Sequence, residues 1–330
     1  MKNISKEVQV RNLKIKNSLV MPPVATYQAD EDGNVNDVLL TYYGERAKGG
    51  NIGLIITEHS YISVEGRMHK KQLSIANDDK IEGLKKLVDV IHQNGTKVFA
   101  QLNHAGSRTS SEITERDIYS SSPIDYYGNV KKEVKELTKE DMKKIINDFV
   151  NAALRAQKAG YDGVEIHSAH GYLLNQFYTP LINKREDEYG GCLENRLRFH
   201  QEIIRAVRSA VGNDFPIALR LGASDYLEGG NTVEVGVKAA EILMKENIDL
   251  IDISGGVLGY IVKGRNEAGY FSDVSKEIKK ISKIPVILTG GVKTLEEADN
   301  LIEKEACDMV GVGRKLFANP YWADDEFSNK

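Results

Sequence analysis

The residues best placed to do chemistry are two histidines and a tyrosine in the stretch 163–172, which reads GVEIHSAHGY. His167 and His170 are three positions apart, and Tyr172 follows two positions later. Imidazole N–H groups can hold a carbonyl oxygen that becomes more negative during a reaction, and a nearby phenol can deliver a proton. These residue types at this spacing predict a site that reduces an activated alkene.

A metal site is the sharpest alternative for the same histidines. Zinc-binding histidines on a helix usually stand at positions i and i+4 with a glutamate nearby. His167 and His170 stand at i and i+3, and they follow a strand-like run in which apolar Val164 and Ile166 alternate with Glu165. The spacing favours carbonyl binding, and no metal site is predicted.

The elements that must position these side chains follow a regular rhythm along the chain. Short apolar runs alternate with longer amphipathic runs, which is typical of a parallel sheet built from repeated strand and helix units. The runs predicted as strands are Ser18–Met21, Ile52–Thr57, Lys97–Leu102, Gly163–Ile166, Pro216–Leu221, Asp249–Ile253, Pro285–Thr289 and Asp308–Val312. The helices predicted between them are Val38–Lys48, Asp79–Asn94, Lys139–Ala159, Leu193–Val211, Val233–Glu246, Val274–Ile281 and Leu295–Lys304.

This rhythm predicts a TIM (β/α)8 barrel of the α/β class, as a single domain over residues 1–330. A Rossmann fold needs fewer strands, and no Gly-x-Gly-x-x-Gly follows the first predicted strand. Two connections are longer than a barrel requires: 103–137 after the third strand and 168–192 after the fourth. Both leave from the face where barrels keep their sites, so we expect them to act as lids.

Glycines gather at the ends of the last two predicted strands. Gly290 and Gly291 follow the seventh strand, and Gly313 and Arg314 follow the eighth. Backbone N–H groups at such turns, together with a guanidinium, are typical of a phosphate site in a barrel. Glycines that merely turn the chain would explain either pair alone, but both pairs together with Arg314 predict a phosphate site.

Residues at two further strand ends indicate which cofactor carries that phosphate. Gln101 offers both a donor and an acceptor to an amide-like ring edge, and Arg220 places a positive charge across the ring of strands. A flavin that accepts hydride becomes anionic, and a nearby guanidinium stabilises that anion, so FMN is the predicted cofactor. The alternative for Arg220 is a buried ion pair with Asp225 or Glu165.

Composition excludes several other classes. The 330 residues carry a net charge of −4, with 41% hydrophobic and 28% charged residues, so nucleic acid is not a predicted partner. No apolar run is long enough to cross a membrane, and the first residues do not resemble a signal peptide, so a cytoplasmic protein is expected. Two cysteines, Cys192 and Cys307, are too few for a disulfide framework or an iron–sulfur cluster.

The chain resembles the Old Yellow Enzyme family of FMN-containing NADH:flavin oxidoreductases and ene-reductases, and in particular its bacterial short-chain branch. The resemblance covers nearly the whole chain. The stretches that carry it are Asn17–Pro23, Phe99–Gly106, Glu165–Tyr172, Asp187–Gly191 with Glu194–Arg196, and Gly311–Arg314.

The resemblance implies a role for each matching position. His167 and His170 would hold the substrate carbonyl, Tyr172 would donate the proton, and Tyr27 would contact the ligand. The residues implied to bind FMN are Pro22, Pro23, Val24, Ala25, His59, Gln101, Arg220, Gly290, Gly291, Gly313 and Arg314. NADH or NADPH would reduce the FMN and leave. An enone or enal would then bind where the coenzyme had been and accept the hydride. A homo-oligomer is also expected.

Two positions depart from the family's pattern. Ala25 stands where relatives often carry threonine or cysteine, a side chain that tunes the flavin potential, so that potential is left open. His59 stands where a small residue is more usual, and the alternatives are that it crowds the ring or supplies an extra donor. Two rival functions remain. A metal-dependent TIM-barrel hydrolase would use His59, His104, His167 and His170 as ligands. A non-catalytic flavin carrier would have no use for the histidines and the tyrosine.

Overall fold

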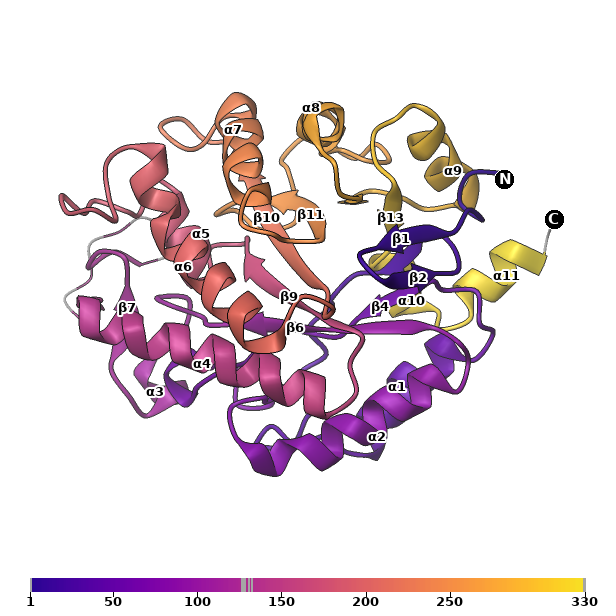
Figure 1. Cartoon of the computed structure of the whole chain (residues 1–330), viewed down its shortest axis with the longest axis horizontal. Helices are drawn as coiled ribbons and strands as arrows, with labels where there is room; N and C mark the ends of the chain where they lie inside the picture. The colour runs from indigo at the N-terminus through magenta and orange to yellow at the C-terminus, as the bar shows by residue number, and fades with distance from the viewer. Residues whose placement is uncertain (1, 126–128, 130, 132, 329–330) are drawn as a thin grey trace.

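Parallel strands form a closed ring at the centre of the molecule (Figure 1). The computed structural model describes residues 2–125, 129, 131 and 133–328. The ring strands are β3 (Leu19–Met21), β4 (Leu54–Ile56), β6 (Lys97–Asn103), β9 (Gly163–Ser168), β10 (Ile217–Ser224), β11 (Leu250–Gly255), β12 (Val286–Thr289) and β13 (Met309–Gly311). Each pairs in parallel with the next, and the ring closes because β13 also pairs with β3.

Helices surround this ring and bury their apolar faces against it. They are α1 (Asp37–Ala47), α2 (Ile81–His92), α4 (Lys139–Lys158), α6 (Leu193–Val211), α7 (Val233–Met244), α8 (Ser272–Ile281) and α9 (Leu295–Glu303). Thr138 and Thr294 begin α4 and α9 with reciprocal capping boxes, which satisfy backbone N–H groups that a helix start leaves unpaired. The predicted (β/α)8 barrel is confirmed, and each predicted strand and helix has a counterpart.

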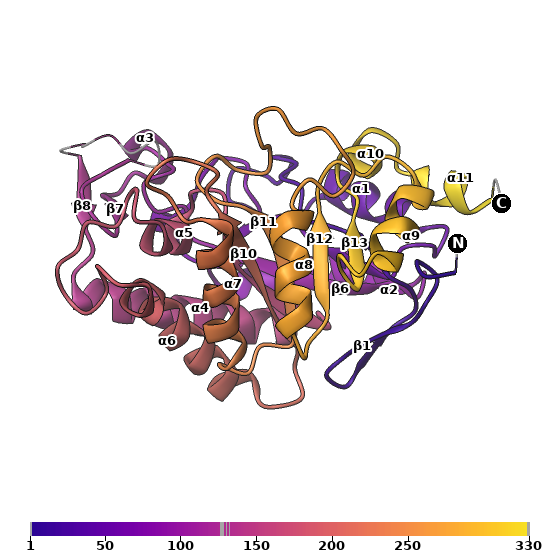
Figure 2. The ribbon, with the colours of Figure 1, turned by 90° about the horizontal axis from the view of Figure 1, so that it is seen from above.

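A hairpin of two short strands, β1 (Val8–Val10) and β2 (Leu13–Ile15), covers the end of the barrel from which the ring strands start. Val10 and Ile15 are fully buried and pack with Phe99, Leu54 and other inward-facing strand residues. Figure 2 shows the hairpin on the opposite end of the barrel from α10 (Arg314–Ala318). This hairpin was not predicted.

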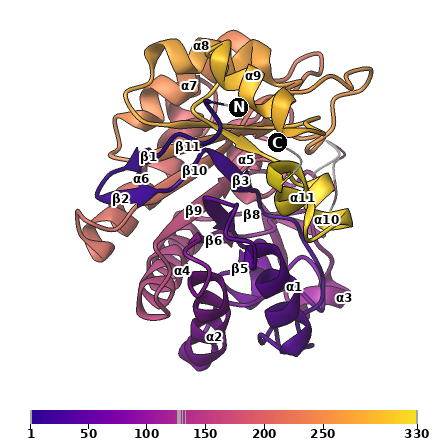
Figure 3. The same cartoon turned by 90° about the vertical axis from the view of Figure 1, so that its right-hand side faces the viewer.

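The remaining short elements lie in the connections between strands and helices. They are β5 (Ser60–Tyr61), β7 (Ile118–Ser120), β8 (Val134–Glu136), α3 (Ser111–Thr114), α5 (Leu173–Tyr178) and α11 (Trp322–Ser328), with 3-10 turns at Val64–Gly66 and Asp78–Lys80. Figure 3 shows the start of the chain beside α9. There the backbone N–H groups of Asn3 and Ile4 donate to Asp299 at 2.7 and 2.8 Å. None of the described helices combines the length and the apolar character needed to cross a bilayer.

The interior of the barrel changes from apolar to polar along its axis. Residues two apart on a strand share one face, so Phe99 and Gln101 of β6 both point inward, one above the other. The lower layer is apolar and includes Phe99, Leu250 and Ile287. The upper layer brings buried polar groups to the carboxyl ends of the strands. These are Gln101, Glu165, Arg220, Asp252 and the partly buried Thr289.

Candidate active site

A cavity of about 510 Å³ opens at the carboxyl ends of the ring strands, above the polar layer. This volume is typical of small-molecule and cofactor sites. Every residue predicted for the site lines it. They are Pro22, Pro23, Val24, Ala25, Tyr27, His59, Gln101, His167, His170, Tyr172, Arg220, Gly290, Gly291, Gly313 and Arg314.

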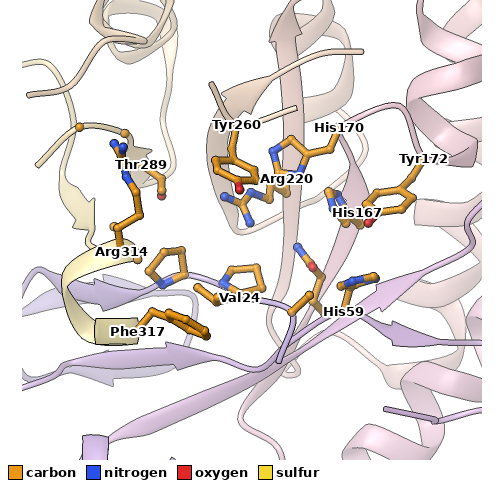
Figure 4. Close-up of a pocket in the computed structure, with 18 of the residues that line it drawn as sticks. Val24, His59, His167, His170, Tyr172, Arg220, Tyr260, Thr289, Arg314 and Phe317 are labelled. Carbon is orange, nitrogen blue, oxygen red and sulfur yellow. The ribbon is translucent and has the colours of Figure 1, made fainter. Parts of the chain in front are cut away.

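The two histidines of the GVEIHSAHGY stretch stand side by side at the end of β9 (Figure 4). Their ring centres are 5.0 Å apart and their planes are nearly perpendicular. His170 has a left-handed backbone, with φ of 60°, and its Nε2 lies 2.7 Å from the hydroxyl of Ser254 at the end of β11. His167 is 2% exposed, and its buried Nδ1 has no hydrogen-bond partner among the described residues. An unpaired buried nitrogen beside a cavity is a candidate contact for a ligand.

Both histidines are neutral at neutral pH. Burial lowers the pKa of His167 and of His170 well below the usual value, and the positive charges of Arg220 and Arg108 lower both further. A neutral imidazole keeps one N–H donor and one acceptor nitrogen. Each histidine can therefore donate one hydrogen bond to an oxygen while it stays uncharged.

A third imidazole, that of His59, lies against the same group. Its ring centre is 5.2 Å from that of Tyr172 and 6.4 Å from that of His167. The side-chain nitrogens of Gln72 and Asn103 lie 3.0 and 3.1 Å from its Nδ1. Amide nitrogens only donate, so Nδ1 is the acceptor and Nε2 carries the proton. Burial, with smaller effects of Arg108 and Arg220, lowers the pKa of His59 to about 3.

Tyr172 begins α5, and its side chain is buried beside His167, with ring centres 4.9 Å apart. Tyr27 comes from the segment after β3 and has a left-handed backbone, with φ of 54°. Its hydroxyl lies 3.3 Å from the sulfur of Met68. Two phenols and three imidazoles therefore border one region of the cavity.

The polar layer below the cavity holds an ion pair. Arg220 Nε lies 3.0 Å from Asp252 Oδ2, and neither atom makes a well-aligned hydrogen bond with the described residues. The alternative partners predicted for Arg220 were wrong. Asp225 instead accepts hydrogen bonds from Thr179 and nearby backbone, and Glu165 accepts one from Gln101 at 2.7 Å.

The two carboxyl groups of this layer resist ionisation. Burial raises the pKa of Glu165, and the neighbouring Asp252 raises it further. Burial also raises the pKa of Asp252, although Arg220 and Thr289 act in the opposite direction. Arg220 lies beside Asp252 and contributes a positive charge to this layer, directly below the cavity.

The opposite end of the cavity carries the glycines and Arg314 (Figure 4). Gly291 has φ of 74°, and a Cβ there would lie 2.0 Å from the carbonyl oxygen of Glu267. No other residue fits at that position without moving backbone. Figure 4 places Arg314 and Tyr172 on opposite sides, with Arg220 between them.

Some lining residues were not predicted. They are Met68, Arg108, Tyr260, Tyr270, Thr289, Val292, Gly311 and Phe317. Thr289 ends the predicted seventh strand and Gly311 is the next-to-last residue of the predicted eighth, so the strand boundaries contained their signal. Arg108 lies in the long connection after β6, which was flagged as a whole without this residue being singled out. Tyr260 and Tyr270 come from the connection between β11 and α8, for which no site residue was predicted.

The four histidines that a metal-dependent hydrolase would use as ligands do not lie together. His104 lies outside the cavity, in a separate hollow with Glu65 and Lys144, and its Nδ1 accepts from the backbone N–H of Gly106. Within the part of the chain that the structure describes, no group of three or more His, Cys, Asp or Glu side chains could hold a metal ion.

Known proteins resemble the chain along nearly its whole length. The model of the family described as NADH:flavin oxidoreductase / NADH oxidase matches residues 4–325. An NADH oxidase from Thermoanaerobacter brockii is 40% identical over 97% of this chain, which covers 50% of that protein. An NADPH dehydrogenase from Clostridium acetobutylicum is 39% identical over 95% of this chain, which covers 91% of that protein.

Solved structures share the architecture. An Old Yellow Enzyme homologue from Zymomonas mobilis superposes with a TM-score of 0.86 at 27% identity, covering 99% of this chain and 93% of that one. A 2-naphthoyl-CoA reductase in complex with 2-naphthoyl-CoA superposes with a TM-score of 0.91 at 26% identity, covering all of this chain and 52% of that one. The chain thus spans about half the length of the NADH oxidase and of this reductase.

Proposed function

This chain belongs to the NADH:flavin oxidoreductase / NADH oxidase family, with its resemblance to the Old Yellow Enzymes confirmed, and on that premise we propose that it is an ene-reductase. It takes hydride from NADH or NADPH and reduces the C=C bond of α,β-unsaturated carbonyl compounds. The observation that carries this proposal is the neutral pair His167 and His170 beside Tyr172, at one end of a cavity whose other end suits a phosphate.

The cavity suits FMN, the cofactor of this family. Arg314 and the turns at Gly290 and Gly313 supply cationic and backbone groups for a phosphate. Arg220, whose Nε lacks a well-aligned hydrogen bond among the described residues, supplies positive charge at the middle. FMN bound there would supply a two-electron carrier between the coenzyme and the alkene.

The side chains of the protein act on the substrate around that transfer. We infer that His167 and His170 donate hydrogen bonds to the carbonyl oxygen, so that negative charge moves onto it as hydride reaches the β-carbon. Tyr172 delivers a proton to the α-carbon and regains one from solvent. In the balanced reaction NAD(P)H loses hydride, the alkene gains hydride and a proton, and one proton is consumed.

Anaerobic stopped-flow spectroscopy tests this function on the FMN-loaded protein. We expect NADH or NADPH to bleach the flavin absorbance and 2-cyclohexenone to restore it, with one cyclohexanone formed per coenzyme oxidised. A protein that is bleached but is reoxidised only by oxygen is an oxidase and not an ene-reductase. A protein that NADH and NADPH both leave yellow is a flavin carrier.

A further inference from the structure

The charged side chains that line the cavity are all of one sign. Arg108, Arg220 and Arg314 carry positive charge, and no Asp or Glu is found among the described lining residues. The histidines there add no charge, because burial lowers their pKa values. A partly enclosed cavity with this charge pattern attracts anions.

Bound FMN accounts for two of the three guanidiniums. Arg314 stands at the glycine end, where the phosphate belongs, and Arg220 lies at the middle of the cavity with Asp252 behind it. This assignment rests on the proposed function. Arg108 is the third lining arginine, and this assignment gives it no role toward the cofactor.

Arg108 lies at the far end, among the groups proposed to hold the substrate. Its guanidinium carbon is 5.0 Å from the ring centre of Tyr172, and its Nη1 donates to the carbonyl oxygen of His170. The same charge lowers the pKa of His167 and opposes the rise in the pKa of Tyr27, whose largest cause is burial. Arg108 lines the same cavity as the imidazole pair and Tyr27.

We propose that Arg108 recognises a carboxylate on the substrate, and that the alkenes reduced here are enones or enals bearing a carboxylate close to the C=C bond. The His167 and His170 pair holds the carbonyl oxygen, and Arg108, bonded to the backbone of His170, stands directly beside that pair. A carboxylate within a few bonds of the carbonyl reaches Arg108 when the carbonyl reaches the histidines. A guanidinium offers planar, charge-assisted hydrogen bonds that suit a carboxylate.

A matched pair of substrates tests the proposal on the FMN-loaded enzyme: trans-4-oxo-2-pentenoate and its methyl ester, which lacks the charge. We expect Arg108→Gln to lower kcat/KM for the acid by about 10- to 100-fold, the loss expected for charge-assisted hydrogen bonds, and to change the ester less than about 3-fold. Arg108→Lys should lie between wild type and Arg108→Gln for the acid. Arg116→Gln, an exposed arginine in the same connection, should leave both substrates unaffected.

Calorimetric titration with the saturated product, 4-oxopentanoate, and its methyl ester gives a readout that does not depend on turnover. The acid should bind the wild type more tightly, and Arg108→Gln should remove that preference. If the enzyme reduces neither alkene, the proposed function fails, while the titration still decides whether Arg108 binds carboxylate.

Two results would overturn the role of Arg108. Equal losses for acid and ester would mean that Arg108 only supports the backbone of His170. A rise in the KM for NADH or NADPH, with the acid-to-ester ratio unchanged, would mean that the cation serves the coenzyme.

Discussion

At the scale of single residues, burial is what sets the chemistry of the site. It keeps the imidazoles of His167 and His170 uncharged, so they act as hydrogen-bond donors of fixed protonation. The same burial, with two amides donating to Nδ1, keeps His59 neutral with its proton on Nε2. His59 therefore supplies a third donor nitrogen beside Tyr172.

His167 and Tyr172 have separable expected effects. His167→Ala should weaken binding of a phenol ligand and slow alkene reduction about 100- to 1000-fold, because one preorganised donor to the oxygen is lost. Tyr172→Phe should slow alkene reduction and keep most of the phenol affinity, because the proton donor alone is lost. Both are measured by the long-wavelength absorbance of the flavin–phenol complex and by stopped-flow reoxidation.

Both variants should retain FMN, since neither residue is assigned to the cofactor. Loss of the flavin from either protein, or equal loss of phenol affinity in both, would contradict these assignments.

Several of the predicted site residues lie on strands, and several of those that were missed lie in the connections between elements. His167 and Arg220 belong to apolar strands, and a parallel barrel brings the carboxyl ends of all strands to one face, so their convergence could be predicted. Arg108 and Tyr260 lie in connections whose paths depend on tertiary contacts. Hydrophobic periodicity carries no information about such paths.

At the scale of elements, the ring strands could be predicted because burial on both faces makes them short apolar runs, and the main helices because their buried faces repeat with a period of 3.6 residues. The β1–β2 hairpin was not predicted, and each of its strands buries only one residue fully, Val10 and Ile15, so neither shows the apolar run of a ring strand. The bond of Arg108 to the backbone of His170 likewise joins two connections that no local pattern relates.

Gln176 of α5 forms hydrogen bonds with both of those connections. Its side-chain oxygen accepts from the backbone N–H of Ser107 and the hydroxyl of Ser120, each at 3.0 Å. Its nitrogen donates to the carbonyl oxygens of Ala105 and Gly171 at 3.1 and 2.7 Å. A fully buried side chain with four such bonds holds the segments that carry Arg108 and His170.

We expect Gln176→Ala to lower the free energy of unfolding by about 3 kcal/mol, because it leaves several buried polar groups without partners. Ser120→Ala removes only one of the bonds and should cost about 1 kcal/mol. Urea unfolding of the FMN-loaded proteins measures both. Similar losses in the two variants would show that Gln176 does not tie the connections together.

At the scale of the whole molecule, buried acids make stability depend on pH. Glu58, at the end of β4, accepts from the hydroxyl of Thr26 at 2.6 Å and from the backbone N–H of Thr26 at 3.2 Å. Burial raises the pKa of Glu58 to about 7, although the bonds from Thr26 act in the opposite direction. The folded state therefore binds a proton that the unfolded state releases near its ordinary pKa of about 4.5.

The stability contributed by protonated Glu58 is fully present below that ordinary pKa and is lost as pH rises through about 7. From pH 5 to pH 8 the wild type should lose up to about 3 kcal/mol relative to Glu58→Gln, which cannot ionise. Urea unfolding at the two pH values measures this difference. The contributions of the other buried acids to the free energy of unfolding cancel, because both proteins contain those acids. Exposed Glu112→Gln serves as the control. Parallel pH profiles for wild type and Glu58→Gln would contradict a protonated Glu58.

The hairpin that covers the lower end of the barrel also bears on kinetics. Among the described residues, apolar side chains fill that end and the cavity opens at the carboxyl ends of the strands, so under the proposed function coenzyme and alkene share this approach. Each reactant then blocks the other when it is in large excess. Steady-state rates should pass through a maximum as either concentration rises, and double-reciprocal plots at lower concentrations should be parallel. Intersecting plots would mean that both molecules occupy the protein at once.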